Sequence, residues 1–176
     1  MPNVTFYQLT QFFNSLALNH PNITTFTIGD LASVDLAKET LYPLLHMVPN
    51  NVTMASGIFT YNFDLIMMDR VTDITNLSSG NFNTLIKNYK DITNVQDVWD
   101  STLLTLNDII SYITRKPLAA NFIITDNTIA TPFQDNFNNL LAGWTATLNV
   151  QTPNDVNMCV FDLTLSEAQG NDSTAY

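Results

Sequence analysis

Charged side chains are scarce in this chain. Of its 176 residues only 12% are Asp, Glu, Lys or Arg, about half the share that soluble proteins usually carry. The charges are also unbalanced, because six Lys and Arg stand against sixteen Asp and Glu and leave a net charge of −10. A protein that grips nucleic-acid phosphates needs several clustered Lys or Arg. The composition therefore disfavours tight DNA or RNA binding, although an acidic wall can face DNA without holding it.

Cysteine, glycine and long apolar runs are scarce as well. Cys159 is the single cysteine, so no disulfide is possible within the chain. The five glycines form no GxGxxG or Walker pattern, which disfavours a phosphate-binding loop. No run of about eighteen apolar residues is present, so we expect no membrane span. No basic segment precedes an apolar one at the N-terminus, so we expect no secretion signal.

Side chains that could carry catalysis are few and isolated. His20 precedes Pro21 at the expected end of a helix, where a capping role is the simpler interpretation. His46 lies among apolar residues of an expected strand, which is typical of a packed histidine. Cys159 has no His or basic neighbour in sequence and is expected to be a small core residue. With no CxxC, HExxH or calcium-loop pattern, we expect no enzyme, no metal site and no cofactor.

Asn and Thr take the place of the missing charges. The chain has 22 Asn and 23 Thr, while its apolar fraction of 45% is that of a globular protein. Such a composition predicts a surface that is polar but mostly neutral. A neutral surface loses less on desolvation than a charged one, so it suits packing against other subunits. Codon bias from an AT-rich genome is the alternative explanation.

The length predicts one domain over residues 1–152, followed by a partly flexible extension over 153–176. Apolar spacing predicts helices over 3–19 and 95–115, a possible short helix over 82–90, and strands over 23–28, 41–49, 56–68, 119–125 and 143–151. We expect Asn94 to cap the second long helix, Pro43 to mark a strand edge or bulge, and 49–57 to be a loop. This order predicts an α+β fold: a mostly antiparallel sheet of four to five strands, with helices packed on one face and a projecting long β-hairpin.

The clearest pattern is GIFTYNFDLIMMDR at 57–70. Its odd positions are apolar, whereas the first even positions are polar, namely Thr60, Asn62 and Asp64. Period-two alternation predicts a strand with one buried face. At Ile66 and Met68 the even positions turn apolar, which indicates burial on both faces at that end. Asp64 and Asp69 are five residues apart, so they should point to opposite faces and cannot act as a pair.

The order of these segments resembles that of the tail terminator (tail completion) proteins of tailed bacteriophages and, more loosely, the head–tail joining proteins of the neck. The resemblance runs from about residue 3 to residue 151. It is carried by an N-terminal helix followed by HPNITTFTIGD, YPLLHMVP, GIFTYNFDLIMMDR, DVWDSTLLTLNDIISYI and AGWTATLNV.

The resemblance implies a virion structural protein rather than an enzyme. Members of that family assemble as homo-oligomeric rings, commonly hexamers, that end the tail and offer a surface to neighbouring connector and tail proteins. Sheets of adjacent subunits line a channel through which DNA passes as cargo. By this resemblance the protein belongs in the tail or neck of the virion, is assembled in the host cytoplasm and has no membrane partner.

A ring subunit uses one sheet face for its helices and the other for a neighbour or the channel. We therefore expect subunit-interface or lumen residues at the tip of the 48–60 hairpin and on the even face of 57–70. The candidates are Asn50, Asn51, Thr53, Thr60, Asn62 and Asp64. Three alternatives remain open: another tail- or baseplate-associated virion component, a small-molecule or peptide binding module with a pocket between helix and sheet, and an enzyme whose site forms only in three dimensions.

Overall fold

The computed structural model describes residues 5–36, 38–55, 57–72, 94–115, 123–125, 127–135 and 140–153. Within them the helices are α1 (Phe6–Asn19), α2 (Val95–Arg115) and the 3-10 turns η1 (Leu31–Ser33) and η2 (Glu39–Leu41). The strands are β1 (Thr25–Ile28), β2 (Leu44–Ala55), β3 (Ile58–Arg70), β4 (Ile123–Ile124), β5 (Ala130–Asp135) and β6 (Leu141–Pro153). The predicted α+β class and both long helices are confirmed. The short helix predicted over 82–90, Cys159 and the extension beyond Pro153 lie outside the described residues.

The described strands form one mixed sheet of six strands in the order β1-β2-β3-β6-β4, with β5 also pairing with β6. The prediction of four to five strands is therefore too low. β1 runs parallel to β2, and the other pairs are antiparallel. The sequence did not reveal β5 because Pro132 and short polar stretches interrupt any alternation. Proline is tolerated in β5 because that strand has only β6 as a strand partner in the described sheet.

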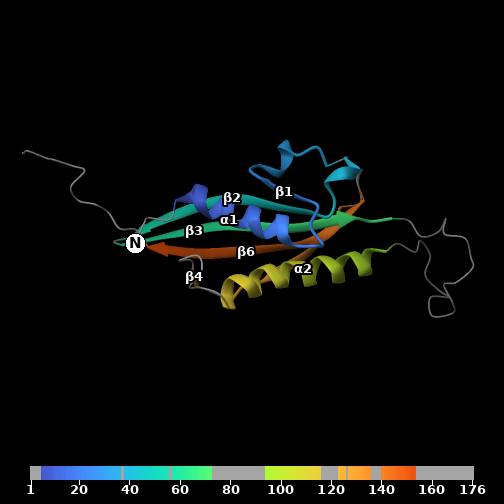
Figure 1. Cartoon of the computed structure of the whole chain (residues 1–176). Helices are drawn as coiled ribbons and strands as arrows, with labels where there is room; N and C mark the ends of the chain where they lie inside the picture. Colours follow the sequence, from blue (N-terminus) through green and yellow to red (C-terminus); the bar gives the residue numbers. More distant parts are fainter. Residues whose placement is uncertain are drawn as a thin grey trace, which may run out of the picture.

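The hairpin of β2 and β3 differs from expectation in its first strand. The predicted loop over 49–57 is wrong, since β2 continues to Ala55 and pairs with β3 as far as Ile58. β2 begins only after Pro43, and the irregularity falls later, where the register shifts between Pro49 and Asn51. β6 pairs with β3 along its entire length, so the sheet is three-stranded up to the turn of the hairpin (Figure 1).

Both long helices pack on the face formed by the odd residues of β3 (Figure 1). One buried cluster joins Leu9, Phe13 and Ala17 of α1, Leu106, Ile109 and Ile113 of α2, Phe63, Leu65 and Met67 of β3, and Leu148 and Val150 of β6. The alternation predicted for 57–70 is thereby confirmed. Burial of this face is the main stabilising term, since each large apolar side chain removed from water contributes about 1.5–3 kcal/mol.

The opposite face of the sheet is covered at one end only. The connection between β1 and β2, which contains η1 and η2, packs there against Leu44, Ile66, Met68 and Leu141. This cover confirms that β3 is buried on both faces around Ile66 and Met68, as their apolar character predicted. Toward the hairpin turn, the described residues place no helix on this face.

Local hydrogen bonds fix where the helices start and end. Thr5 caps α1 in a reciprocal box with Gln8, a pattern visible in the sequence as Thr-x-x-Gln. His20 is the C-cap of α1, as expected, and its backbone N–H donates to the carbonyl of Ala17. Asn94 precedes α2, but its side chain accepts from the backbone N–H of Thr72 at 2.6 Å. Asn94 therefore ties the start of α2 to the end of β3, and its capping of α2 stays a prediction.

Candidate functional site

Five of the six residues predicted for an interface lie on one face of the sheet. Thr60, Asn62 and Asp64 occupy alternate positions of β3, and the register places Thr53 opposite Thr60 and Asn51 opposite Asn62. Directly opposed residues of antiparallel strands point to the same face. Asn50 is the exception, because it is the extra residue of the bulge and has no partner in the register.

β6 adds a third row to this face. Thr147, Asn149 and Gln151 lie opposite Asp64, Asn62 and Thr60. Two hydrogen bonds join the rows: Asn62 Nδ2 donates to Asn149 Oδ1 at 2.8 Å, and Thr147 Oγ1 donates to Asp64 Oδ1 at 2.6 Å. We call the resulting surface the polar sheet face; it comprises Asn51, Thr53, Thr60, Asn62, Asp64, Thr147, Asn149 and Gln151. Its β6 members were not among the predicted site residues, although the alternation of 143–151 indicates their side.

The polar sheet face is almost free of charge. Residues 41–63 and 141–153, which contribute all its members except Asp64, contain no Asp, Glu, Lys or Arg. The chain has a net charge of −10. Because these two segments carry no charge, the acidic side chains other than Asp64 lie in other parts of the sequence. The hydroxyl of Thr147 hydrogen-bonds Asp64, so the one carboxylate on the face is held within the sheet.

The outer edge of β2 adjoins this face. β1 pairs only with the first residues of β2, from Leu44 to Met47. From Val48 to Ala55 this edge has no strand partner among the described residues. Val52 and Met54 of this stretch are 40% and 76% exposed. An uncharged edge with unpaired backbone groups is a template for pairing with another chain, which Pro49 and the bulge restrict to the part beyond Asn50.

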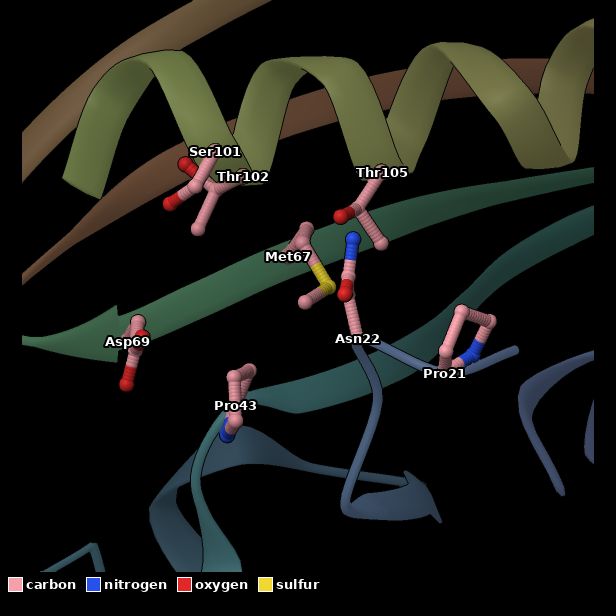
Figure 2. A pocket seen from close by; sticks show the side chains of 8 residues that line it. All are labelled: Pro21, Asn22, Pro43, Met67, Asp69, Ser101, Thr102 and Thr105. Carbon is pink, nitrogen blue, oxygen red and sulfur yellow. The ribbon is translucent and has the colours of Figure 1, made fainter. Parts of the chain in front are cut away.

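A pocket lies on the helix side of the sheet, between α2, the end of β3 and the segment after α1 (Figure 2). Its volume is about 350 Å³. The lining residues are Pro21, Asn22, Pro43, Met67, Asp69, Ser101, Thr102 and Thr105. We call it the Asp69 pocket. Thr102 and Thr105 were missed by sequence analysis because threonines on the buried stripe of a helix give no apolar signal.

The two strand carboxylates have different environments, and they lie on opposite faces as predicted. Asp64 belongs to the polar sheet face, whereas Asp69 lines the pocket beneath α2. Burial raises the pKa of Asp69, and a hydrogen bond from the Arg70 backbone N–H at 2.7 Å offsets part of that rise. The Arg70 guanidinium pairs with Glu39 at 2.7 Å. It gives Asp69 no ion pair.

His46 has a structural role, as expected. It is fully buried, its Nδ1 lies 2.6 Å from Thr27 Oγ1, and its Nε2 lies 3.1 Å from the carbonyl oxygen of Gly29. Because a carbonyl only accepts, Nε2 carries the proton and Nδ1 accepts from the Thr27 hydroxyl. Burial lowers the pKa of His46, while the Gly29 hydrogen bond and the charge of Asp30 act in the opposite direction. The ring is therefore held neutral.

Within the described ranges, no three His, Cys, Asp or Glu side chains come close enough to hold a metal ion. In the same part of the chain, neither helix has the length and apolar character needed to cross a membrane. No protein-family model matches the chain, and no curated protein matches it. The functional argument therefore rests on the polar sheet face, the β2 edge and the Asp69 pocket.

Proposed function

We propose that this protein is a virion structural protein that assembles into a ring at the tail end or head–tail neck of a tailed bacteriophage. The observation that supports this proposal is the polar sheet face, whose single charged side chain is Asp64, beside an unpaired strand edge. Copies that each carry a charge of −10 repel one another. The desolvation free energy lost on association is smallest for a surface that has neutral hydrogen-bonding groups and almost no charge.

A ring follows if the contact is made between different surfaces of neighbouring copies. The β2 edge from Asn51 to Ala55 and the β3 and β6 rows of the polar sheet face are different surfaces of one subunit. A contact between the β2 edge of one copy and another surface of the next is head-to-tail, and head-to-tail contacts close into rings when the rotation allows. In this arrangement a ring of six or more copies would terminate the tail and contact connector and tail proteins.

The remaining part of the polar sheet face would line the DNA channel. Its Asn and Thr groups offer no cation to phosphate, and Asp64 repels it. DNA that must pass quickly through a channel is retained by a basic wall and released by a neutral or acidic one. Assembly in the host cytoplasm, without a membrane partner, completes the proposal.

The decisive experiment combines native mass spectrometry of the full chain with negative-stain electron microscopy. We expect the wild type to form rings with a central hole. The double variant Thr60→Arg/Asn62→Arg places two cations on the polar sheet face and should give monomers with an unchanged circular dichroism spectrum. The matched control is Gln11→Arg/Gln96→Arg, which adds the same charge at exposed helix positions and should still form rings.

Three results would overturn parts of the proposal. A wild type that stays monomeric at high concentration and in the presence of connector and tail proteins would contradict ring formation. Rings that persist in Thr60→Arg/Asn62→Arg would show that the polar sheet face is not the contact. Loss of rings in the control as well would show that net charge, rather than this face, governs assembly.

A further inference from the structure

The Asp69 pocket presents mainly hydrogen-bond acceptors. Ser101 Oγ donates to the carbonyl of Val98 at 3.1 Å, and Thr102 Oγ1 donates to the same carbonyl at 2.5 Å. Each hydroxyl has one proton, so these bonds leave both oxygens with lone pairs only. Pro21 and Pro43, which form part of the wall, have no backbone N–H to donate. The donors that remain in the lining are the side-chain amide of Asn22 and the hydroxyl of Thr105.

Asp69 adds a negative charge to this lining. One carboxylate oxygen accepts from the Arg70 backbone, and among the described residues the other oxygen has neither a hydrogen bond nor an ion pair. Thr105, which is only 1% exposed, and the side-chain amide of Asn22 likewise make no hydrogen bond within the described part of the chain. Figure 2 shows Asn22 reaching across the pocket toward Thr105, with Met67 between them and Asp69.

We propose that the Asp69 pocket binds a protonated primary amine on a short alkyl chain, whose ammonium group is held by Asp69. An ammonium group carries one positive charge and three N–H donors, which matches one carboxylate among surplus acceptors. Met67 and the two prolines provide apolar contacts for the alkyl chain. The volume of about 350 Å³ falls in the range of small-ligand sites.

Other ligand classes fit the pocket less well. An anion would meet the charge of Asp69 in a half-buried site. A divalent cation needs several charged or carbonyl oxygens, and Asp69 is the single carboxylate among the lining residues. The amine itself has two chemical sources, a free alkylamine or the side chain of a lysine on another protein. This inference does not depend on the proposed ring, because the pocket lies on the helix side of the sheet.

The test is a titration of the full chain with butylammonium chloride at pH 8 and constant ionic strength, followed by amide chemical shifts in NMR. We expect saturable shifts around Met67, Asp69 and Thr105, and binding at least about tenfold weaker in Asp69→Asn. Asp64→Asn removes the same charge from the polar sheet face and should leave binding unchanged.

Several outcomes would overturn the amine site. The first is the absence of saturable chemical-shift changes in the wild type, and the second is an equal loss of affinity in Asp69→Asn and Asp64→Asn. The third is binding of n-butanol as tight as that of butylammonium. The fourth is displacement of butylammonium by equimolar sodium or magnesium ions. A parallel titration with Nα-acetyl-lysine amide separates the two sources. Tighter binding of the lysine derivative assigns the site to a protein side chain, and equal or weaker binding assigns it to a free alkylamine. Rings that form normally in Asp69→Asn would leave the proposed function intact while the amine site is lost.

Discussion

Asn62 and Asn149 lie opposite each other on β3 and β6 and share a side-chain hydrogen bond of 2.8 Å. They are 87 residues apart in sequence, so this bond exists only because the two strands have a fixed register. Asn51 of β2 lies on the other side of Asn62, which gives a row of three asparagines across three strands. The Asn62–Asn149 bond joins β3 to β6, and the row of amides adds no charge to the face.

The Asn62–Asn149 bond should appear as an energetic coupling. We expect Asn62→Ala and Asn149→Ala to be non-additive, with a coupling of about 0.5–1 kcal/mol in the free energy of unfolding. Urea denaturation of the two single variants and the double variant measures it. Asn62→Ala combined with Gln96→Ala on α2 is the control and should be additive. A coupling no larger than that of the control would mean that the bond does not stabilise the sheet.

Gly143 should not accept any side chain. It lies opposite Met68 in the β3–β6 register, and a Cβ there would overlap the carbonyl oxygen of Met67. The atoms that would overlap the new Cβ belong to the backbone of Met67 and Met68, so the overlap is relieved only if β3 and β6 move apart. We therefore expect Gly143→Ala to lower the free energy of unfolding by about 2 kcal/mol or more.

Gly57→Ala is the comparison for Gly143→Ala. Gly57 has a positive φ of 78° but open space around its Cα, so backbone strain alone should cost about 1 kcal/mol. The urea midpoints of the two variants show which substitution destabilises the fold more. A midpoint for Gly143→Ala equal to or above that of Gly57→Ala would contradict the close approach of β3 and β6.

His46 should make the fold sensitive to acid. Because burial lowers its pKa in the folded state below the ordinary value of 6.5, the unfolded chain binds more protons just below pH 6.5. The free energy of unfolding therefore falls as the pH drops below about 6.5, by at most about 1.4 kcal/mol per pH unit. Urea denaturation at several values between pH 5 and pH 8 measures this slope. In His46→Gln the slope should flatten, and an unchanged slope would assign it to other groups.

Thr152 should be improved by an apolar replacement. Its hydroxyl is buried and has no hydrogen-bond partner within the described ranges. Thr152→Val keeps the shape of the side chain and removes an unsatisfied polar atom. We therefore expect the free energy of unfolding, measured by thermal denaturation, to rise by about 1 kcal/mol. Thr102→Val is the matched control, because the Thr102 hydroxyl bonds the Val98 carbonyl and its loss should bring no gain. Equal gains in the two variants would contradict the explanation.

Much of the fold could be predicted because the signals are local. The alternation of 57–70 assigned each residue of β3 to its face, including the separation of Asp64 from Asp69. The apolar stripe of 95–115 gave α2, whose buried residues include Val98, Leu106 and Ile109. These predictions succeed because the period of a strand or a helix is a property of the backbone.

Other elements depend on partners that are distant in sequence. The second half of β2, from Asn50 to Ala55, is rich in residues that strands disfavour, and it is a strand because β3 pairs with it. β5 is stabilised in the same way by β6. Of the predicted interface residues, Asn51, Thr53, Thr60, Asn62 and Asp64 have partners in the register, whereas Asn50 falls in the bulge, which the sequence does not reveal.

The sequence by itself determined which face of β3 is polar and that this polarity is carried by the neutral Thr60 and Asn62 and by one carboxylate, Asp64. Only the tertiary structure decided that β2 and β6 extend the same face with Asn51, Asn149 and their neighbours. It also decided that Asp69 and three hydroxyl side chains of α2 line the same pocket. The physical reason is that periodicity acts over a few residues, whereas strand register and helix packing depend on the burial of residues far apart in the chain.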